Sequence, residues 1–97
     1  MYTVKQTLEF AAWFRELKDR TTRSRIVARI ERVQLGNFGD AKPVGGGVSE
    51  LRLAFGPGYR IYFARVGDTI ILLLYGGDKA SQARDIDRAR SLAAELE

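Results

Sequence analysis

The chain has no cysteine and no histidine among its 97 residues, and it contains only two prolines. It can therefore form no disulfide, no Cys/His zinc site, no thiolate nucleophile and no Ser-His-Asp triad of its own. Its longest apolar run, TIILLLY at residues 69–75, is too short to span a bilayer, and no basic-then-apolar leader opens it. The length predicts one domain, residues 1–97, and the absence of cysteine fits a reducing cytoplasm.

Positive charge is in moderate excess. Sixteen lysines and arginines stand against twelve aspartates and glutamates, which gives a net charge of +4 and a sequence pI near 9.8. Such a balance favours a polyanion or an acidic protein as partner, although an ordinary solvated surface explains a charge of this size equally well.

The hydrophobic pattern predicts an α+β domain with the element order β-αα-βββ-α. The expected elements are a strand at 2–6, a helix capped by Thr7, a second helix from Thr22 or Ser24 to about Leu35, strands at 48–55, 59–66 and 69–75, and a final helix capped by Ser81. The glycine-rich segment 36–47 is expected to be a loop. It lacks the Gly-Lys-Ser/Thr ending of a P-loop. We therefore prefer to interpret it as a connection between elements, and the alternative is a flexible loop that contacts a ligand through Lys42.

The stretch ELRLAFGPGYRIYF, residues 50–63, predicts a hairpin whose register decides where its charges lie. A two-residue turn would place Arg52 and Arg60 on opposite faces, whereas a three-residue loop at 56–58, with Phe55 opposite Tyr59, places them on one face. The longer loop separates apolar from polar positions cleanly, and we therefore prefer it. The polar face then carries Glu50, Arg52, Ala54, Arg60, Tyr62 and Ala64. It is either the floor of a site or a solvent-facing surface with an Arg-Glu pair.

Three stretches, ELRLAFGPGYRIYF, ILLLYGGDKASQARDI and FAAWFRELKD, closely resemble small toxins of the RelE/ParE superfamily, in particular its HigB-like "addiction module killer" branch. The resemblance covers nearly the whole chain. It implies a RelE-like fold in which a helical hairpin and a C-terminal helix pack on a small, mainly antiparallel sheet.

The resemblance also implies a function. RelE-like members are toxins of type II toxin-antitoxin modules that cut messenger RNA, often on the ribosome, without a metal or other cofactor, and so inhibit translation and growth. The implied partners are mRNA, the ribosome and a helix-turn-helix antitoxin, and operator DNA is contacted only through the antitoxin complex.

The family's functional residues map onto the hairpin and the start of the last helix. Arg60 and Lys79 match two of them, and Arg52 matches one of two basic positions whose other member is Glu50 here. Arginine binds phosphate oxygens through its planar fork, so Arg60 and Arg52 are expected to stabilise the transition state. Lys79 is expected to hold the phosphate or protonate the leaving oxygen, and Glu50 is the best-placed proton acceptor in a chain without histidine.

Further RNA contacts are expected from Lys42, Tyr62, Gln82 and Arg29, the last of which belongs to a stripe with Arg25 and Arg32 that equally suits a solvated helix face. Two other functions remain open. One is a ParE-like inhibitor of DNA gyrase that acts by protein binding, and the other is a nucleic-acid-binding module without catalysis.

Overall fold

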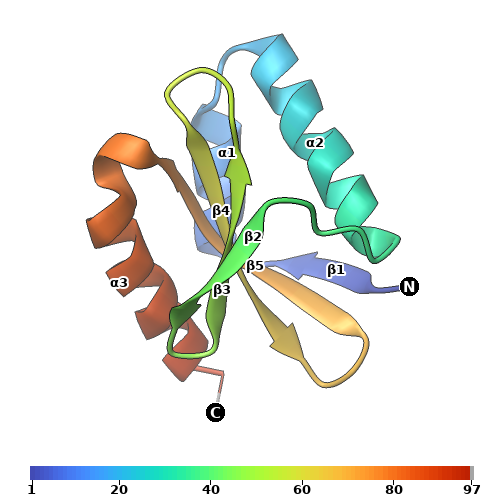
Figure 1. Ribbon diagram of the computed structural model, residues 1–97. Coiled ribbons are helices and arrows are strands. Elements are labelled where there is room, and N and C mark those ends of the chain that lie inside the picture. Colours follow the sequence, from blue (N-terminus) through green and yellow to red (C-terminus); the bar gives the residue numbers. More distant parts are fainter. Residues whose placement is uncertain (97) are drawn as a thin grey trace.

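The computed structural model describes residues 1–96 and shows a five-stranded sheet with helices on both faces (Figure 1). The elements are β1 (Thr3–Gln6), α1 (Leu8–Glu16), α2 (Arg20–Gln34), β2 (Ala41–Gly45), β3 (Val48–Leu53), β4 (Tyr59–Val66), β5 (Ile70–Asp78), the 3-10 helix η1 (Lys79–Ser81) and α3 (Gln82–Ala94). The strand order is β1-β5-β4-β3-β2. β1 runs parallel to β5, and every other neighbouring pair is antiparallel. The predicted α+β class is confirmed.

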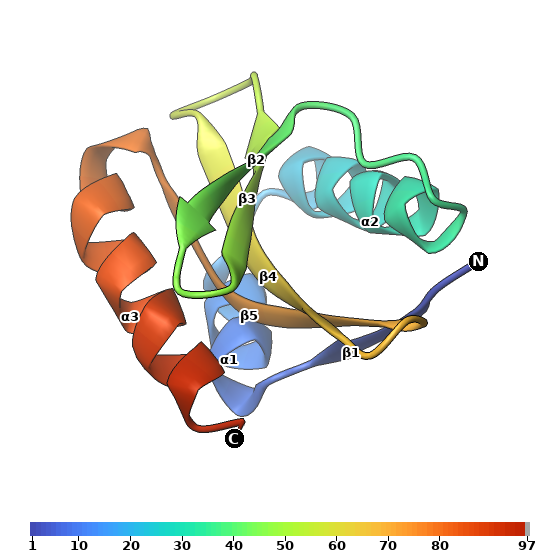
Figure 2. The ribbon, with the colours of Figure 1, turned by 60° about the horizontal axis from the view of Figure 1, so that its bottom comes forward.

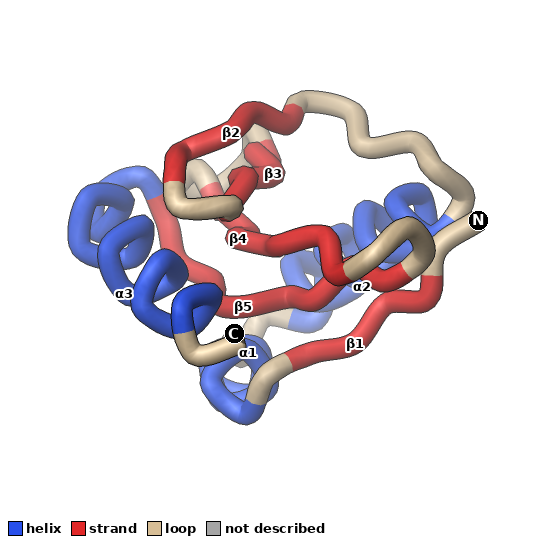
Figure 3. The backbone as a smooth tube through the Cα atoms, turned by 90° about the horizontal axis from the view of Figure 1, so that it is seen from below, coloured by secondary structure: helices blue, strands red, loops and turns tan. Residues whose placement is uncertain are grey.

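Each face of the sheet has its own core. The core under α1 and α2 contains Phe10, Ile26, Val33, Leu51, Leu53, Ile61, Phe63, Ile71 and Leu73. The core under α3 contains Val48, Tyr62, Ala64, Leu74, Ala89 and Leu92. Figure 2 shows α3 and α2 on opposite sides of the strands, and Figure 3 shows β1 beside β5 at one edge with β2 at the other. Within residues 1–96, no helix has the length and apolar character needed to cross a membrane.

The β3–β4 hairpin keeps the predicted faces but not the predicted partners. Leu53 pairs with Tyr59, so the loop spans the five residues 54–58, and Arg52 lies directly opposite Arg60. The expected three-residue loop, with Phe55 opposite Tyr59, is wrong by two residues. Because side chains alternate with a period of two, a shift of two leaves each side chain on its expected face. Arg52 and Arg60 therefore share the face that α3 covers.

Several boundaries also differ from the sequence prediction: β3 ends at Leu53 rather than at residue 55, and β5 runs on to Asp78 rather than ending at residue 75. The segment 36–47 contains β2, an edge strand that pairs with β3 and tolerates Pro43 because an edge strand leaves some backbone N–H groups without a ladder partner. The second helix begins earlier than expected, since Asp19 is its N-cap and accepts a hydrogen bond from the backbone N–H of Thr22 at 2.9 Å. The predicted cap at Thr7 is confirmed by its 2.9 Å hydrogen bond from Phe10 N.

Two consecutive glycines on β5 let a helix approach closely on each side of the sheet. A Cβ on Gly76 would overlap the Trp13 indole of α1, and a Cβ on Gly77 would lie 2.7 Å from Cγ of Asp85 on α3. The glycine pair therefore sets how closely α1 and α3 pack, and with it the position of the first turn of α3.

Candidate functional site

Two arginines and one glutamate form the centre of the polar face beneath α3. Glu50 Oε1 lies 3.3 Å from Nε of Arg52 and 3.9 Å from Nε of Arg60. The Glu50 side chain has no exposed surface, whereas the side chains of Arg52 and Arg60 are 35% and 11% exposed. The carboxylate thus lies inside the protein within ion-pair distance of both Nε atoms, neither of which has a hydrogen-bond partner within residues 1–96.

Gln82, in the first turn of α3, fixes the same carboxylate from the other side. Its Nε2 donates to Glu50 Oε2 at 2.9 Å and to Oε1 at 3.2 Å. Gln82 therefore bonds to both oxygens of Glu50, and Oε1 also faces the Nε atoms of the two arginines. This environment differs from the one expected for a general base, because a fully covered carboxylate cannot reach a 2′-hydroxyl on a bound strand. Gln82 itself is oriented towards Glu50.

Arg60 and Lys79 meet beside the β3–β4 loop. Nη1 of Arg60 donates to the carbonyl oxygens of Gly58 at 3.0 Å and Tyr59 at 3.3 Å, which fixes the guanidinium over the loop. Gly58 has a φ of +78°, and a Cβ there would lie 3.3 Å from Arg60 Nη1 and 3.4 Å from Lys79 Cβ. Gly58 thus leaves room for both side chains, and Lys79 is exposed.

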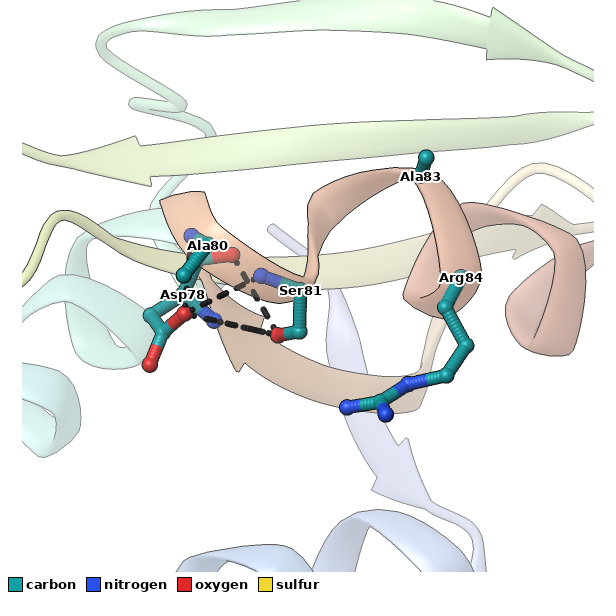
Figure 4. Close-up of a pocket in the computed structure, with 5 residues that line it drawn as sticks. All are labelled: Asp78, Ala80, Ser81, Ala83 and Arg84. Atoms are coloured by element: carbon teal, nitrogen blue, oxygen red, sulfur yellow. Dashed lines mark hydrogen bonds between the residues drawn. The ribbon is translucent and has the colours of Figure 1, made fainter.

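A hollow of about 540 Å³ lies where β5 passes through η1 into α3, and Figure 4 shows its lining. Oδ1 of Asp78 accepts hydrogen bonds from the backbone N–H groups of Ala80 at 2.9 Å and Ser81 at 3.2 Å, so Asp78 caps η1. Arg84, whose side chain is 83% exposed, also lines the hollow. The sequence analysis did not select Arg84; its place one helical turn after Ala80 was the available signal.

A second buried carboxylate stands at the base of α3. Asp85 is 3% exposed and accepts a hydrogen bond from Ser81 Oγ. The predicted helix cap at Ser81 is therefore only partly right: Ser81 occupies the N-cap position of α3, but its hydroxyl bonds to side chains and to the turn before it rather than to a helical N–H.

Tyr62 is fully buried in the core under α3. Its hydroxyl has no hydrogen-bond partner within residues 1–96. Burial raises the pKa of the Tyr62 phenol above 10.0, the negative charges of Glu50 and Asp85 raise it further, and the positive charge of Arg60 opposes them. A ring that α3 covers cannot stack on an RNA base, so the expected contact of Tyr62 with RNA does not fit this environment.

Arg29 is also buried, at 7% exposure. Its guanidinium donates to the carbonyl oxygens of Phe38 at 3.0 and 3.2 Å, Asp40 at 3.0 Å and Arg52 at 2.8 Å. Burial lowers the pKa of Arg29, and the positive charge of Arg32 adds to the effect. Each guanidinium nitrogen of Arg29 donates to a backbone carbonyl, which ties α2 to β3 and does not fit the expected RNA contact.

Lys42 is exposed on the edge strand β2, where it is paired with Glu50 of β3. It therefore shares the α3-side face of the sheet with Arg52 and Arg60. The structure thus brings Arg52, Arg60, Lys79 and Glu50 together and leaves Lys42 at the rim, while Arg84 lines the neighbouring hollow.

This arrangement of sheet and helices is the fold of the RelE toxins. The chain superimposes on a double mutant of the E. coli toxin RelE in the free state with a TM-score of 0.68, at 17% identity over 98% of this chain and 96% of that one. It superimposes on a chain of the intact E. coli RelBE toxin-antitoxin complex with a TM-score of 0.63, at 13% identity over 80% of this chain and 96% of that one.

The protein belongs to the phage-derived Gp49-like family (DUF891), a family of RelE- and HigB-like toxins, whose profile matches residues 12–94. An uncharacterized protein of Haemophilus influenzae is 46% identical over 93 residues, which cover 96% of this chain and 94% of that protein. The predicted relationship to the RelE/ParE superfamily is confirmed.

Proposed function

We propose that this protein is the toxin of a type II toxin-antitoxin pair and acts as an endoribonuclease on messenger RNA. One observation carries the proposal: Arg52 and Arg60 are direct cross-strand neighbours on one face, and Lys79 lies next to Arg60. Two cross-strand guanidinium groups with a lysine residue beside them fit a phosphodiester, which gains negative charge during its cleavage.

The reaction proposed is transesterification by the RNA itself. The 2′-oxygen attacks the adjacent phosphorus in line, the new O2′–P bond forms, and the P–O5′ bond breaks. The products are a 2′,3′-cyclic phosphate and a 5′-hydroxyl. The 2′-hydroxyl loses one proton and the leaving 5′-oxygen gains one, so the protein's tasks are alignment, charge stabilisation and proton transfer.

Arg60 is best placed to stabilise the pentacoordinate phosphorus. Its guanidinium is fixed by the carbonyls of Gly58 and Tyr59 and lies within ion-pair distance of Glu50, so little reorganisation accompanies phosphate binding. Arg52, which is more exposed, would bind a second phosphate oxygen. Lys79 would hold the phosphate or donate the proton to the 5′-oxygen.

Glu50 is proposed as a positioning residue for the two arginines rather than as the base. Its complete burial and its bonds to Gln82 support this role, because a fixed carboxylate restricts the rotamers of both guanidinium groups. A protein without histidine has a weak proton-transfer apparatus, and we propose that the ribosome supplies part of the alignment. Equal cleavage rates on naked and ribosome-bound message would contradict ribosome dependence.

Induced expression in a bacterium tests the function. Wild type should arrest growth, lower translation before DNA synthesis, and produce new message ends with 5′-hydroxyls. Arg60→Ala and Lys79→Ala should abolish all three effects, while the exposed control Arg15→Ala on α1 retains them. Full toxicity of both site variants would refute the assignment, and an early fall in DNA synthesis would favour the gyrase-inhibitor function instead.

A toxin of this kind requires an antitoxin, and we propose a helix-turn-helix protein as the partner. The likeness to a chain of the E. coli RelBE toxin-antitoxin complex supports a protein partner of this class. Co-expression with the partner should restore growth, and the two chains should elute together in size-exclusion chromatography.

A further inference from the structure

The positive charge of the chain is concentrated on α2. This helix carries five arginines and one glutamate, so its net charge of +4 equals that of the whole chain. Within residues 1–96, no α2 arginine takes part in an ion pair. A helix with this much unneutralised charge is suited to a polyanion.

Part of that charge borders a cleft between α2 and the β3–β4 hairpin. The cleft has a volume of about 260 Å³, and it is lined by Arg25, Ala28, Arg29, Arg32, Leu53, Ala54 and Phe55. Arg25 and Arg32 are exposed, and the Arg25 guanidinium carbon lies 4.7 Å from the centre of the half-buried Phe55 ring. Arg29 lies beneath them and bonds to the Arg52 carbonyl, which fixes the helix against β3.

One loop, residues 54–58, separates the cleft from the proposed cleavage site. Ala54 and Phe55, at the start of the β3–β4 loop, line the cleft, and Gly58, at its end, holds Arg60 next to Lys79. Figures 1 and 2 show the loop between the start of α3 on one side and α2 on the other. Cations therefore lie on both flanks of a five-residue loop.

We infer that this cleft is a second RNA subsite, which binds the substrate strand beyond the cleaved phosphate. Arg25 and Arg32 bind phosphates of the strand, and the Phe55–Arg25 stack accepts a base against its surface. An apolar, aromatic floor with a basic rim matches single-stranded nucleic acid, which offers both stacking faces and phosphates. The inference rests on the proposed function, because it places the cleaved phosphate at Arg60.

Binding of a long single-stranded RNA tests the subsite. The RNA carries a 2′-O-methyl group on each ribose so that it cannot be cleaved, and its affinity is measured by fluorescence anisotropy across a salt series. Each phosphate contact contributes about 0.7 to the slope of log K against log salt for a single strand, so Arg25→Ala/Arg32→Ala should lower the slope by about 1.4. Affinity at low salt should fall about tenfold. The control Arg15→Ala/Arg20→Ala removes the same charge from exposed positions outside the cleft and should keep the wild-type slope.

Cleavage of ribose-containing RNAs separates this inference from the proposed function. The ratio of kcat/KM on a long RNA to kcat/KM on a trinucleotide should fall for the Arg25/Arg32 pair and stay constant for the control pair. The subsite would be overturned if the kcat/KM ratio of the Arg25/Arg32 variant were unchanged, or if the control variant lost as much of the salt slope. It would also be overturned if the Arg25/Arg32 variant lost binding only to an acidic protein or to the ribosome and not to RNA. Cleavage that does not depend on Arg60 would instead overturn the proposed function, whatever the salt slope shows.

Discussion

Replacing Gly77 by alanine should destabilise the protein because α3 leaves no room for a methyl group at that position. The added Cβ would overlap the Asp85 carboxylate and lie 2.7 Å from its Cγ and 3.1 Å from Ser81 Oγ. Gly77 does not adopt a left-handed conformation, so its backbone accepts alanine and the penalty is one of space alone. Asp85, which is buried, must move and lose its bond to Ser81.

The expected cost follows from these two consequences. Overpacking a close-packed site costs about 1–3 kcal/mol, and a buried acceptor without its partner costs about 1–3 kcal/mol more. We therefore expect Gly77→Ala to lower the free energy of unfolding by about 3 kcal/mol. For a urea dependence of roughly 1–1.5 kcal/mol per molar, the denaturation midpoint should fall by about 2–3 M.

A double-mutant cycle identifies the cause. Asp85→Ala removes the clashing group, so Gly77→Ala should cost little in the Asp85→Ala background, with a coupling energy of about 2 kcal/mol. Gly76→Ala is the matched control, because its Cβ meets Trp13 on the opposite face, and its cost should add to that of Asp85→Ala. A Gly77→Ala cost below 1 kcal/mol, or strict additivity with Asp85→Ala, would refute this explanation of the glycine pair.

Three further changes test the buried polar groups and the helix start. Glu50→Ala should lower the free energy of unfolding by about 3–5 kcal/mol in urea titrations, since it leaves Arg60 without its carboxylate; a change within 0.5 kcal/mol would contradict the account. Burial and nearby carboxylates raise the pKa of Tyr62, so the stability due to its neutral phenol is present below pH 10.0 and is lost as the pH rises towards the raised value. Tyr62→Phe should therefore be neutral or stabilising at pH 7 and reduce the loss of stability above pH 10, and a curve parallel to wild type at high pH would contradict this. Thr7→Ala should cost about 1 kcal/mol, because it removes the cap hydrogen bond to Phe10 N, and unchanged stability would show that the cap contributes nothing.

The alternation of side chains explains why the faces of the hairpin were predictable from sequence while its partners were not. Loops of three and five residues give the same faces, because both contain an odd number of residues. The longer loop forms because Phe55 N–H bonds to the Leu53 carbonyl and Gly58 N–H to the Phe55 carbonyl, which closes two successive turns. Periodicity carries no information on such turns.

Burial of the polar face depends on tertiary packing that the sequence pattern does not report. Alternation places Glu50 and Tyr62 on one face but does not tell whether a helix covers it. α3 covers it through an apolar stripe that includes Ala89 and Leu92. Arg29 resembles its exposed neighbours on a helical projection, and only the distant carbonyls of residues 38–40 and 52 show that it is structural.

The resemblance in sequence located Arg60 and Lys79, whose proximity depends on Gly58 and was not derivable from spacing alone. At this point Gly58 of the β3–β4 loop lies beside Lys79 of η1. The sequence was therefore enough to identify residues of the candidate site, whereas their arrangement in space could be seen only in the folded structure.

The most direct test of the account is the rate at which purified protein cleaves a message fragment bound to the ribosome. Arg60→Ala should lower kcat by about 10²–10³, the loss that follows removal of one preorganised donor to a developing negative charge, while Arg15→Ala cleaves at the wild-type rate. Equal cleavage by wild type and Arg60→Ala, with both proteins folded, would contradict the claim that the two cross-strand arginines form the phosphate site.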